Sequence, residues 1–255
     1  ALDDEANRDK YAAFAEGYKV YFDPSTRFMR GLDSEGNWRT PFNPRASNHR
    51  NDDYCEGTAW QWTWFVPHDV DGLVELMGGR DAFIGKLDSL FTADSKLEGE
   101  STSVDISGLI GQYAHGNEPS HHIAHLYNYV GQPCRTQEIV DEVLHTLYFN
   151  NPDGLSGNED CGQMSAWYIL NAMGFYQVCP GKPVYSIGRP LFNEATVHLK
   201  DGKSFKVIAH NNSRDNKYVR SIVLNGNKLE TPFFTHQDIV DGGTLELTMG
   251  SEPLK

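Results

Sequence analysis

The sequence predicts a mainly helical fold that ends in an antiparallel β segment. Apolar residues recur at the 3.6-residue spacing of amphipathic helices through most of residues 1–180. After Cys179, Pro180 and Gly181 the spacing changes to the two-residue alternation of strands. Long polar segments join the expected helices, which is typical of a helical toroid or bundle whose loops gather at one end. We therefore expect a helical domain over residues 1–180 and a sheet over residues 181–255.

The first half of the chain contains four expected helices. The first runs from Asp3 to Tyr18 and carries Tyr11, Phe14 and Tyr18 on one face. Residues 23–47 are rich in Gly, Pro, Asn and Ser and predict a long irregular segment with short extended pieces. The remaining helices of this half are expected over residues 58–65, from the cap Asp69 to Gly78, and over residues 80–91.

Three more helices are expected before the sheet. Asn117 as a cap, Pro119 in the first turn and Gly131 as a stop frame a helix over residues 120–130. The next helix opens near Thr136 and runs towards Asn150, and the last spans about Gly162 to Met173. Strands are expected over residues 196–200, 204–210, 218–224 and 244–249, with the first two joined through Asp201 and Gly202.

Composition excludes several classes of partner. The formal net charge is −13, and no cluster of Lys and Arg offsets it locally, so binding to nucleic acid or to anionic lipid is not expected. No stretch approaches the roughly 20 apolar residues that span a bilayer. The sequence begins at Ala1 directly on a helical pattern, from which we expect a piece of a longer polypeptide.

Three segments place an acid beside glycine or asparagine at the entrance to an expected helix. They are residues 54–64 (YCEGTAWQWTW), 115–122 (HGNEPSHH) and 154–168 (GLSGNEDCGQMSAWY). Unpaired N–H groups and the helix dipole hold a carboxylate ionised at such a position. Each of the acids Glu56, Glu118, Glu159 and Asp160 can equally be a residue that only starts a helix, and spacing leaves this simpler interpretation open.

Sugar linkages are cleaved by two carboxyls on opposite sides of a sugar ring, one protonated and one ionised. Aromatic rings beside such a pair offer flat surfaces to the C–H faces of the sugar. The candidate rings are Trp38, Trp60, Trp62 and Trp64, of which Trp38 and Trp60 are expected to bind the sugar. Trp60 and Trp64 are one helical turn apart, a spacing that is also typical of core residues. The residues alone predict no more than a generic hydrolase.

The runs EGTAWQWTWFVPHDVDGL, HGNEPSHHIAHLYNYVGQP and GLSGNEDCGQMSAWYILNAMGFYQVCPG resemble the signature segments of glycoside hydrolase family 92. Residues 184–253, with FKVIAHNN and SIVLNG, also look like the end of such proteins. Members of the family are exo-acting, calcium-dependent α-mannosidases. The resemblance implies that residues 1–180 are the C-terminal part of an (α/α)6 catalytic toroid and that residues 181–255 supply β-sandwich strands. It also implies an N-terminal part of the same protein that this chain lacks.

The resemblance further implies a single-displacement, inverting reaction. Glu56 in the EGTAWQ motif resembles the general acid, and Asp160 in the GNED motif resembles the general base. Some family members have an acid where Asn158 stands, and an amide cannot accept a proton, so Asp160 would carry the base role here. His115 and Asn158 are then expected to bind substrate beside Trp38 and Trp60.

Calcium is the implied metal. It prefers oxygen ligands from carboxylates, amides, backbone carbonyls and water, which suits Asn117 and Glu118. The metal is expected to bind two adjacent mannose hydroxyls and to help flatten the ring. The expected partners are mannose-containing glycans, and the expected location is secreted, periplasmic or at the cell surface. The alternative for Asn117 is that it only caps the helix starting near Pro119.

Two other functions stay open at this point. His121 and His125 are spaced i, i+4, a spacing that can bind zinc, with His115 or His122 as a third ligand, although no complete zinc signature is present. A zinc-dependent hydrolase is therefore one alternative. The other is a carbohydrate-binding or structural fragment without catalysis, because half of the active-site wall would be absent.

Overall fold

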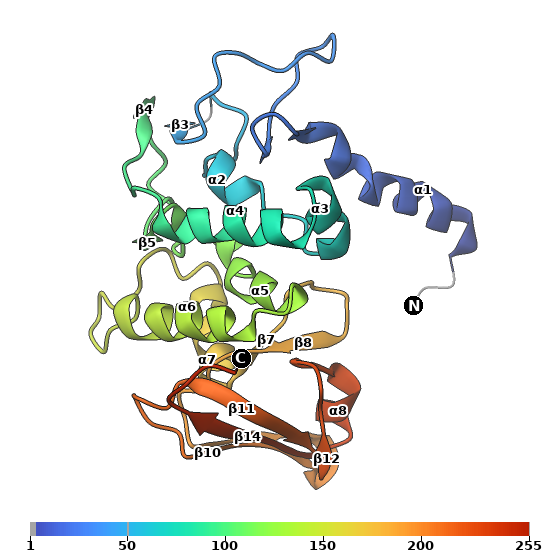
Figure 1. The fold of residues 1–255 in the computed structure, drawn as a ribbon, viewed down its shortest axis with the longest axis vertical. Coiled ribbons are helices and arrows are strands. Elements are labelled where there is room, and N and C mark those ends of the chain that lie inside the picture. Colours follow the sequence, from blue (N-terminus) through green and yellow to red (C-terminus); the bar gives the residue numbers. More distant parts are fainter. Residues whose placement is uncertain (1–3, 50, 255) are drawn as a thin grey trace. The chain divides into compact units, whose positions relative to one another are not determined.

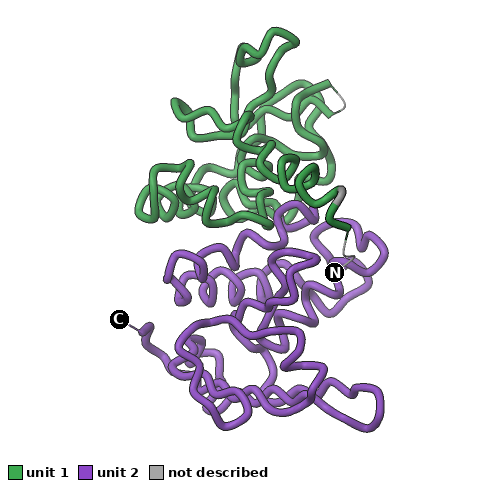
Figure 2. The backbone as a smooth tube through the Cα atoms, turned by 90° about the vertical axis from the view of Figure 1, so that its right-hand side faces the viewer, with its two compact units in different colours: residues 1–114 green, residues 115–255 purple. Residues whose placement is uncertain are grey.

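The structure, a computed structural model, describes residues 4–49 and 51–254 and divides into two units, residues 1–114 and residues 115–255 (Figures 1 and 2). The limit predicted between residues 180 and 181 falls inside unit 2. The start of the first helix predicted at Asp3 lies outside the described residues. That residues 1–180 and 181–255 belong to a toroid and a sandwich stays a prediction.

Unit 1 confirms the four helices predicted in the first half of the chain, mostly at shorter lengths. A 3-10 helix, η1, follows the first of them. Residues Asp4, Thr58 and Asp69 cap three of the helices through side-chain oxygens that accept backbone N–H groups. The elements are α1 (Glu5–Ala15), η1 (Gly17–Tyr21), α2 (Ala59–Trp62), α3 (Val70–Leu76) and α4 (Arg80–Thr92).

The core of unit 1 lies under α4. Its apolar face buries Phe83, Leu87 and Leu90 as predicted, and the ring of Phe83 meets Trp64 edge-on at 5.4 Å. Three short ladders brace the connecting segments. They pair β1 (Phe22–Asp23) with β2 (Phe28–Met29), β3 (Ala46–Asn48) with β4 (Glu98–Ser101), and β5 (Leu109–Ile110) with β6 (Tyr113–Ala114).

The helical part of unit 2 differs from the prediction at residues 120–130. Asn117 does cap this segment, since its Oδ1 accepts from the Glu118 N–H, but the chain forms short separate turns instead of one helix. The cause is that these residues are buried on nearly every side, so tertiary contacts outweigh the helical pattern. The elements are η2 (Glu118–Ser120), η3 (Ile123–His125), α5 (Leu126–Tyr129), α6 (Pro133–Thr146) and α7 (Gln163–Met173).

The predicted strands lie in a five-stranded sheet with the order β12-β11-β14-β10-β9. The sheet is mixed and not wholly antiparallel as predicted, because β10 pairs with β14 in parallel. The hairpin of β9 and β10 forms as predicted, with Phe205 opposite Val197. The strands are β9 (Glu194–His198), β10 (Ser204–His210), β11 (Tyr218–Leu224), β12 (Asn227–Lys228) and β14 (Gly243–Gly250).

A second, three-stranded sheet packs on this one through aromatic rings. It contains β7 (Phe175–Tyr176), β8 (Val184–Ile187) and β13 (Phe233–Thr235), and α8 (His236–Val240) follows β13. The ring of Phe234 stacks on Phe205 at 5.9 Å and meets Phe175 at 5.3 Å. Because β7 directly follows α7, this core fixes the end of α7 against the sheets.

A buried polar network joins η3, α7 and β8. His125 donates from Nε2 to Asn171 Oδ1 at 2.8 Å, and its Nδ1 accepts from the Ser186 hydroxyl at 3.0 Å. Asn171 Nδ2 donates to the Trp167 carbonyl, which fixes the amide with its oxygen towards the imidazole. The fully buried ring is therefore held in its neutral form, and burial lowers the pKa of His125 to about 4.

This network predicts that acid destabilises unit 2. The unfolded ring takes up a proton below pH 6.5, whereas the folded ring does so only near pH 4, so the free energy of unfolding falls as the pH drops between these values. Between pH 7 and pH 5 the loss from His125 alone is about 2 kcal/mol. Urea unfolding at both pH values measures it. His125→Gln should flatten the dependence, with His198→Gln, which removes an exposed imidazole, as the matched control. An unchanged slope in His125→Gln would contradict this account.

Candidate functional site

In unit 1, the predicted acid Glu56 lies on a tightly held turn just before α2. Its backbone is in the left-handed region at φ 51°, and its side chain is exposed. Trp62 Nε1 donates to the carbonyl of Cys55 at 2.8 Å and fixes the preceding peptide. Gly57 is required beside this indole, because a Cβ there would lie 2.8 Å from Trp62 Nε1.

A capping box anchors the other side of this turn. The Gln61 amide oxygen accepts from the N–H and the hydroxyl of Thr58 at 2.7 and 2.8 Å, and Gln61 Nε2 donates to the Gln112 carbonyl. All the residues of the box are buried. Glu56 is thus an exposed carboxylate on a left-handed residue, supported by buried hydrogen bonds on its C-terminal side.

The two tryptophans predicted to bind sugar have protein neighbours of their own. Trp60 meets Phe28 edge-on at 4.9 Å and lies 4.7 Å from the Lys86 ammonium. Trp38 pairs with Leu32 in an isolated bridge and lies 5.5 Å from the Arg30 guanidinium. Their role in substrate binding stays a prediction.

In unit 2, the second and third acidic segments are in direct contact. A Cβ on Gly157 would lie 2.3 Å from the carbonyl oxygen of Gly116, so the two backbones touch where neither residue has a side chain. His121 ties the same segments together, since its Nε2 donates to the His115 carbonyl at 3.0 Å and its Nδ1 accepts from Gln163 at 3.1 Å. Asn117 and Glu118 are therefore held beside the segment that carries Asn158 and Asp160.

The ring of His115 forms part of the packed floor below these segments. Its Nε2 lies 2.7 Å from the Tyr148 hydroxyl, and the ring meets Trp167 at 4.3 Å. Trp167 in turn donates to the His121 carbonyl at 2.9 Å. Burial lowers the pKa of His115 well below 6.5, so the ring is neutral at physiological pH. Contact of His115 with a substrate stays a prediction.

The predicted metal ligands offer oxygen atoms. Glu118 is half-buried, and its charge lies close enough to Tyr176 to add to the effect of burial, which raises the pKa of that phenol to about 12. Asn117 supplies an amide oxygen that also accepts from the Glu118 N–H, which confirms the capping interpretation without excluding the metal. With the carbonyl of Gly116 nearby, this donor set consists of the hard oxygens that Ca2+ prefers and fits it chemically.

The structure separates the two acids of the GNED motif. Glu159 accepts from the N–H and the hydroxyl of Ser165 at 2.9 and 2.8 Å, so it stabilises the first turn of α7. Asp160 and Cys161 both have left-handed backbones, at φ 44° and 56°, and the Asp160 side chain is exposed. Of the two acids in this motif, Glu159 therefore has the helix-start role that the sequence left open.

The zinc alternative receives no support from the histidines. His121 and His125 lie in different turns, and the hydrogen bonds described above engage both ring nitrogens of each. Within residues 4–49 and 51–254, no group of three or more His, Cys, Asp and Glu side chains is placed to hold a metal ion. A metal at Glu118 would therefore also use amide, carbonyl or water oxygens.

The residues that support these acids are not predicted by the sequence motifs. Gln163 at the start of α7 donates both to His121 and to the Tyr176 hydroxyl. Tyr148 also donates to the Met164 carbonyl at 3.1 Å. One feature of the sequence could have indicated Gln163, namely a polar residue in the first turn of α7 beside buried positions. Its partners could not be identified from the sequence, because they lie 42 and 13 residues away.

A family model, a curated relative and solved structures all indicate a glycoside hydrolase. Residues 1–251 match the model of the glycosyl hydrolase family 92 catalytic domain. The chain is 32% identical over 200 residues to an uncharacterized secreted glycosidase of Arthroderma benhamiae, which covers 77% of this chain and 24% of that protein.

Two solved structures from Bacteroides thetaiotaomicron are also similar. One is a family GH92 α-mannosidase in complex with mannoimidazole, with 42% identity, a TM-score of 0.90, and coverage of 98% of this chain and 34% of that one. The other is a family GH92 inverting mannosidase, with 41% identity, a TM-score of 0.83, and coverage of 96% and 34%. This chain thus spans about a third of the length of these solved relatives and about a quarter of the fungal one.

The left-handed backbone at Glu56 predicts an unusual order of stability among variants. A residue with a Cβ costs about 1–2 kcal/mol in this conformation, and glycine does not, so Glu56→Gly should be more stable than Glu56→Ala by about 1 kcal/mol. Asp160→Gly and Asp160→Ala should behave alike. Glu75, exposed on the helix α3, is the matched control, where alanine should be the more stable by about the same amount. Urea unfolding measures all six variants. Equal stability of the two Glu56 variants would contradict the strain.

Proposed function

Because the chain belongs to glycosyl hydrolase family 92, we propose that the protein containing it removes terminal α-linked mannose from glycans by an inverting, calcium-assisted reaction. One observation supports this proposal above the others. The expected acid and base, Glu56 and Asp160, are both exposed carboxylates on left-handed residues at the entrances of α2 and α7. Strained, exposed carboxylates on well-supported turns are typical of catalytic positions.

Glu56 is the general acid in this proposal. It protonates the glycosidic oxygen as the bond to the leaving group breaks. The hydrogen bond from Trp62 to the Cys55 carbonyl and the capping box of Thr58 and Gln61 hold its backbone in place. Little reorganisation of the turn is then needed during the reaction.

Asp160 is the general base. It removes a proton from the water that attacks the anomeric carbon from the side opposite the leaving group. Glu159 cannot share this role without giving up its bonds to Ser165. Asn158, an amide, orients substrate by hydrogen bonding, with His115 and the rings of Trp38 and Trp60 as further substrate contacts.

Asn117 and Glu118 would hold Ca2+, with carbonyl and water oxygens completing its shell. When bound, Ca2+ supplies a positive charge that polarises two adjacent mannose hydroxyls and favours a flattened ring. The chain's own contribution is to hold these oxygen atoms in position. The contact of Gly116 with Gly157 and the bridge through His121 perform that task.

The proposal also includes the arrangement and location of the whole protein. Residues 1–180 would complete an (α/α)6 toroid together with an N-terminal part of the same protein, and residues 181–255 would belong to a β-sandwich. None of the helices in the described part of the chain is long and apolar enough to span a membrane. With a relative named as a secreted glycosidase, we propose a secreted, periplasmic or cell-surface enzyme that acts on mannose-containing glycans.

The acid and the base can be told apart by their substrates. Glu56→Gln should reduce kcat/KM on α-linked mannobiose by roughly 10²–10⁴-fold but have much less effect on α-mannosyl fluoride, whose leaving group needs no proton. Asp160→Asn should reduce hydrolysis of both substrates, because water activation is lost in each. Steady-state kinetics of the complete gene product measure this.

The matched controls for this experiment are Glu75→Gln on α3 and Asp153→Asn, which are both exposed carboxyls outside the proposed machinery. Full activity of Glu56→Gln on the disaccharide would contradict the acid assignment. Binding of mannosides by the unaltered protein without any turnover would identify a non-catalytic carbohydrate-binding protein instead.

Removal of metal tests the calcium proposal. Chelation should abolish hydrolysis, and Ca2+, but not Zn2+, should restore it. Glu118→Gln should weaken Ca2+ binding, measured by calorimetry, by about tenfold or more, which corresponds to at least ~1.4 kcal/mol. Glu142→Gln, an exposed carboxyl on α6, is the matched control. Undiminished activity after exhaustive chelation would contradict the role of calcium.

A further inference from the structure

Arg27 and Lys86 are two neighbouring cations of unit 1. Lys86 is half-buried on α4, and its ammonium lies 3.1 Å from the centre of the Phe28 ring. Arg27 directly precedes Phe28 in the chain. Among the residues that the structure describes, neither of the two side chains forms an ion pair or a hydrogen bond. This is unexpected in a chain where Asp and Glu outnumber Lys and Arg by 35 to 22.

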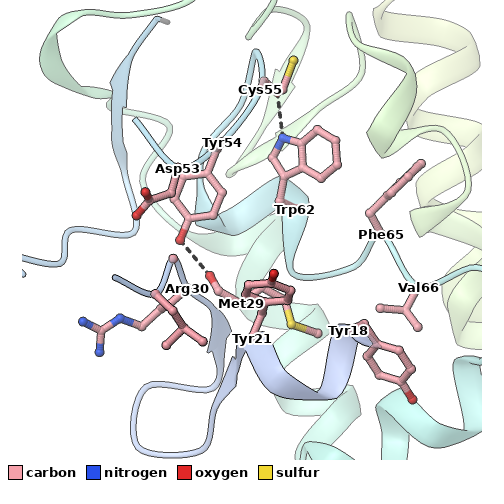
Figure 3. Close-up of a pocket in the computed structure, with 12 residues that line it drawn as sticks. Tyr18, Tyr21, Met29, Arg30, Asp53, Tyr54, Cys55, Trp62, Phe65 and Val66 are labelled. Carbon is pink, nitrogen blue, oxygen red and sulfur yellow. Dashed lines mark hydrogen bonds between the residues drawn. The ribbon is translucent and has the colours of Figure 1, made fainter. Parts of the chain in front are cut away.

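The polar groups that follow Phe28 and lie around the turn before α2 already have protein partners. Arg30 donates to Asp23 at 2.6 Å. Figure 3 shows Arg30 at a cavity of about 540 Å³, where dashed lines mark the bonds that Tyr54 and Trp62 donate to backbone carbonyls. The charge of Arg30 is therefore balanced within the protein. The surroundings of Lys86 are different, because its ammonium faces aromatic rings instead of oxygen atoms.

The indole of Trp60 adds a third donor at the same place. The centre of its ring lies 4.7 Å from the Lys86 ammonium, and the ring meets Phe28 edge-on at 4.9 Å. Its Nε1 is buried and has no hydrogen-bond partner in the part of the chain that the structure describes. Because a buried N–H without an acceptor is costly, this donor favours a ligand that supplies the missing acceptor.

The backbone of Arg27 is strained. Its φ is 56°, in the left-handed region where a side chain is unfavourable and glycine is not. Its N–H donates to the Asp23 carbonyl at 2.7 Å and closes the turn between β1 and β2, a role that glycine would fill without strain. An exposed cation retained in this conformation favours a function for its side chain.

The two positive charges also oppose each other. Burial, and next the charge of Arg27, lower the pKa of Lys86 to about 7. The aromatic faces attract an ammonium but do not balance its charge. An anion beside the two side chains would remove the repulsion and accept charge-assisted hydrogen bonds from both. An oxyanion has further lone pairs that can accept from the indole N–H as well.

We propose that Arg27, Lys86 and the indole N–H of Trp60 form a binding site for a small oxyanion such as inorganic sulfate or phosphate. The two cations would supply charge-assisted hydrogen bonds, and the Phe28 ring would pack beside the ammonium. The bound anion would link α4 to α2 and to the turn between β1 and β2. This site does not depend on the proposed function, since neither of the proposed catalytic carboxylates takes part in it.

Titration calorimetry of the complete gene product with sodium sulfate, at fixed ionic strength, tests this site. Lys86→Met keeps an apolar side chain against Phe28 and should lower the affinity for sulfate about tenfold, as expected for the loss of one charge-assisted hydrogen bond. Arg27→Gly should lower it about threefold, because an exposed charge contributes less. The same Arg27→Gly variant should resist urea better than the unaltered protein, since the left-handed strain is removed.

Lys96→Met, which removes an exposed lysine in the segment after α4, is the matched control and should bind sulfate as the unaltered protein does. A lower affinity together with a higher stability in Arg27→Gly cannot come from misfolding. Absence of saturable sulfate binding to the unaltered protein, or equal affinity in all four proteins, would overturn the proposal. Equal stabilisation of all four by sulfate, without a difference in affinity, would reveal only the general effect of this salt and would overturn it too.

Discussion

The candidate site in unit 2 depends on two hydrogen bonds made by the neutral imidazole of His121. Its Nε2 donates to the His115 carbonyl and its Nδ1 accepts from Gln163, so one ring joins the HGNE segment to the start of α7. A protonated ring could not accept from Gln163, and burial lowers the pKa of His121 to about 4. With Gly116 against Gly157, this bridge leaves Asn117, Glu118, Asn158 and Asp160 on backbones that cannot move independently.

The proposed catalytic carboxylates differ from the residues that hold them in exposure and in backbone strain. Glu56 and Asp160 are exposed and strained, whereas the residues that hold them, Gln61 and Thr58 in one unit and His121 in the other, are buried and hydrogen-bonded. Such a division is expected where a reactive group must meet a ligand in one fixed geometry. It also explains why Glu159, next to Asp160, has a different role: its carboxylate is already used by Ser165 at the first turn of α7.

Sequence predicted the elements whose signals are local. The helix α3 has a capping Asp69, α4 has a regular apolar face, and α7 ends at Gly174 in the left-handed region. The hairpin of β9 and β10 has a clear turn. The helix expected over residues 120–130 failed because burial there is nearly complete and no periodic polar face remains. The parallel pairing of β10 with β14 has no local signal, since three strands lie between them in the chain. Likewise, the motifs identified Glu56 and Asp160, but Gln163 and Tyr148 contact His121 and His115, which lie 42 and 33 residues away in the sequence.

The central proposal is that Glu56 acts as the general acid and Asp160 as the general base of a single displacement by water. Proton NMR of the sugar first released from an α-mannoside, recorded before mutarotation, tests it most directly. A single displacement by water predicts that β-mannose appears first. Initial release of α-mannose would require a covalent intermediate on the enzyme and would contradict the account.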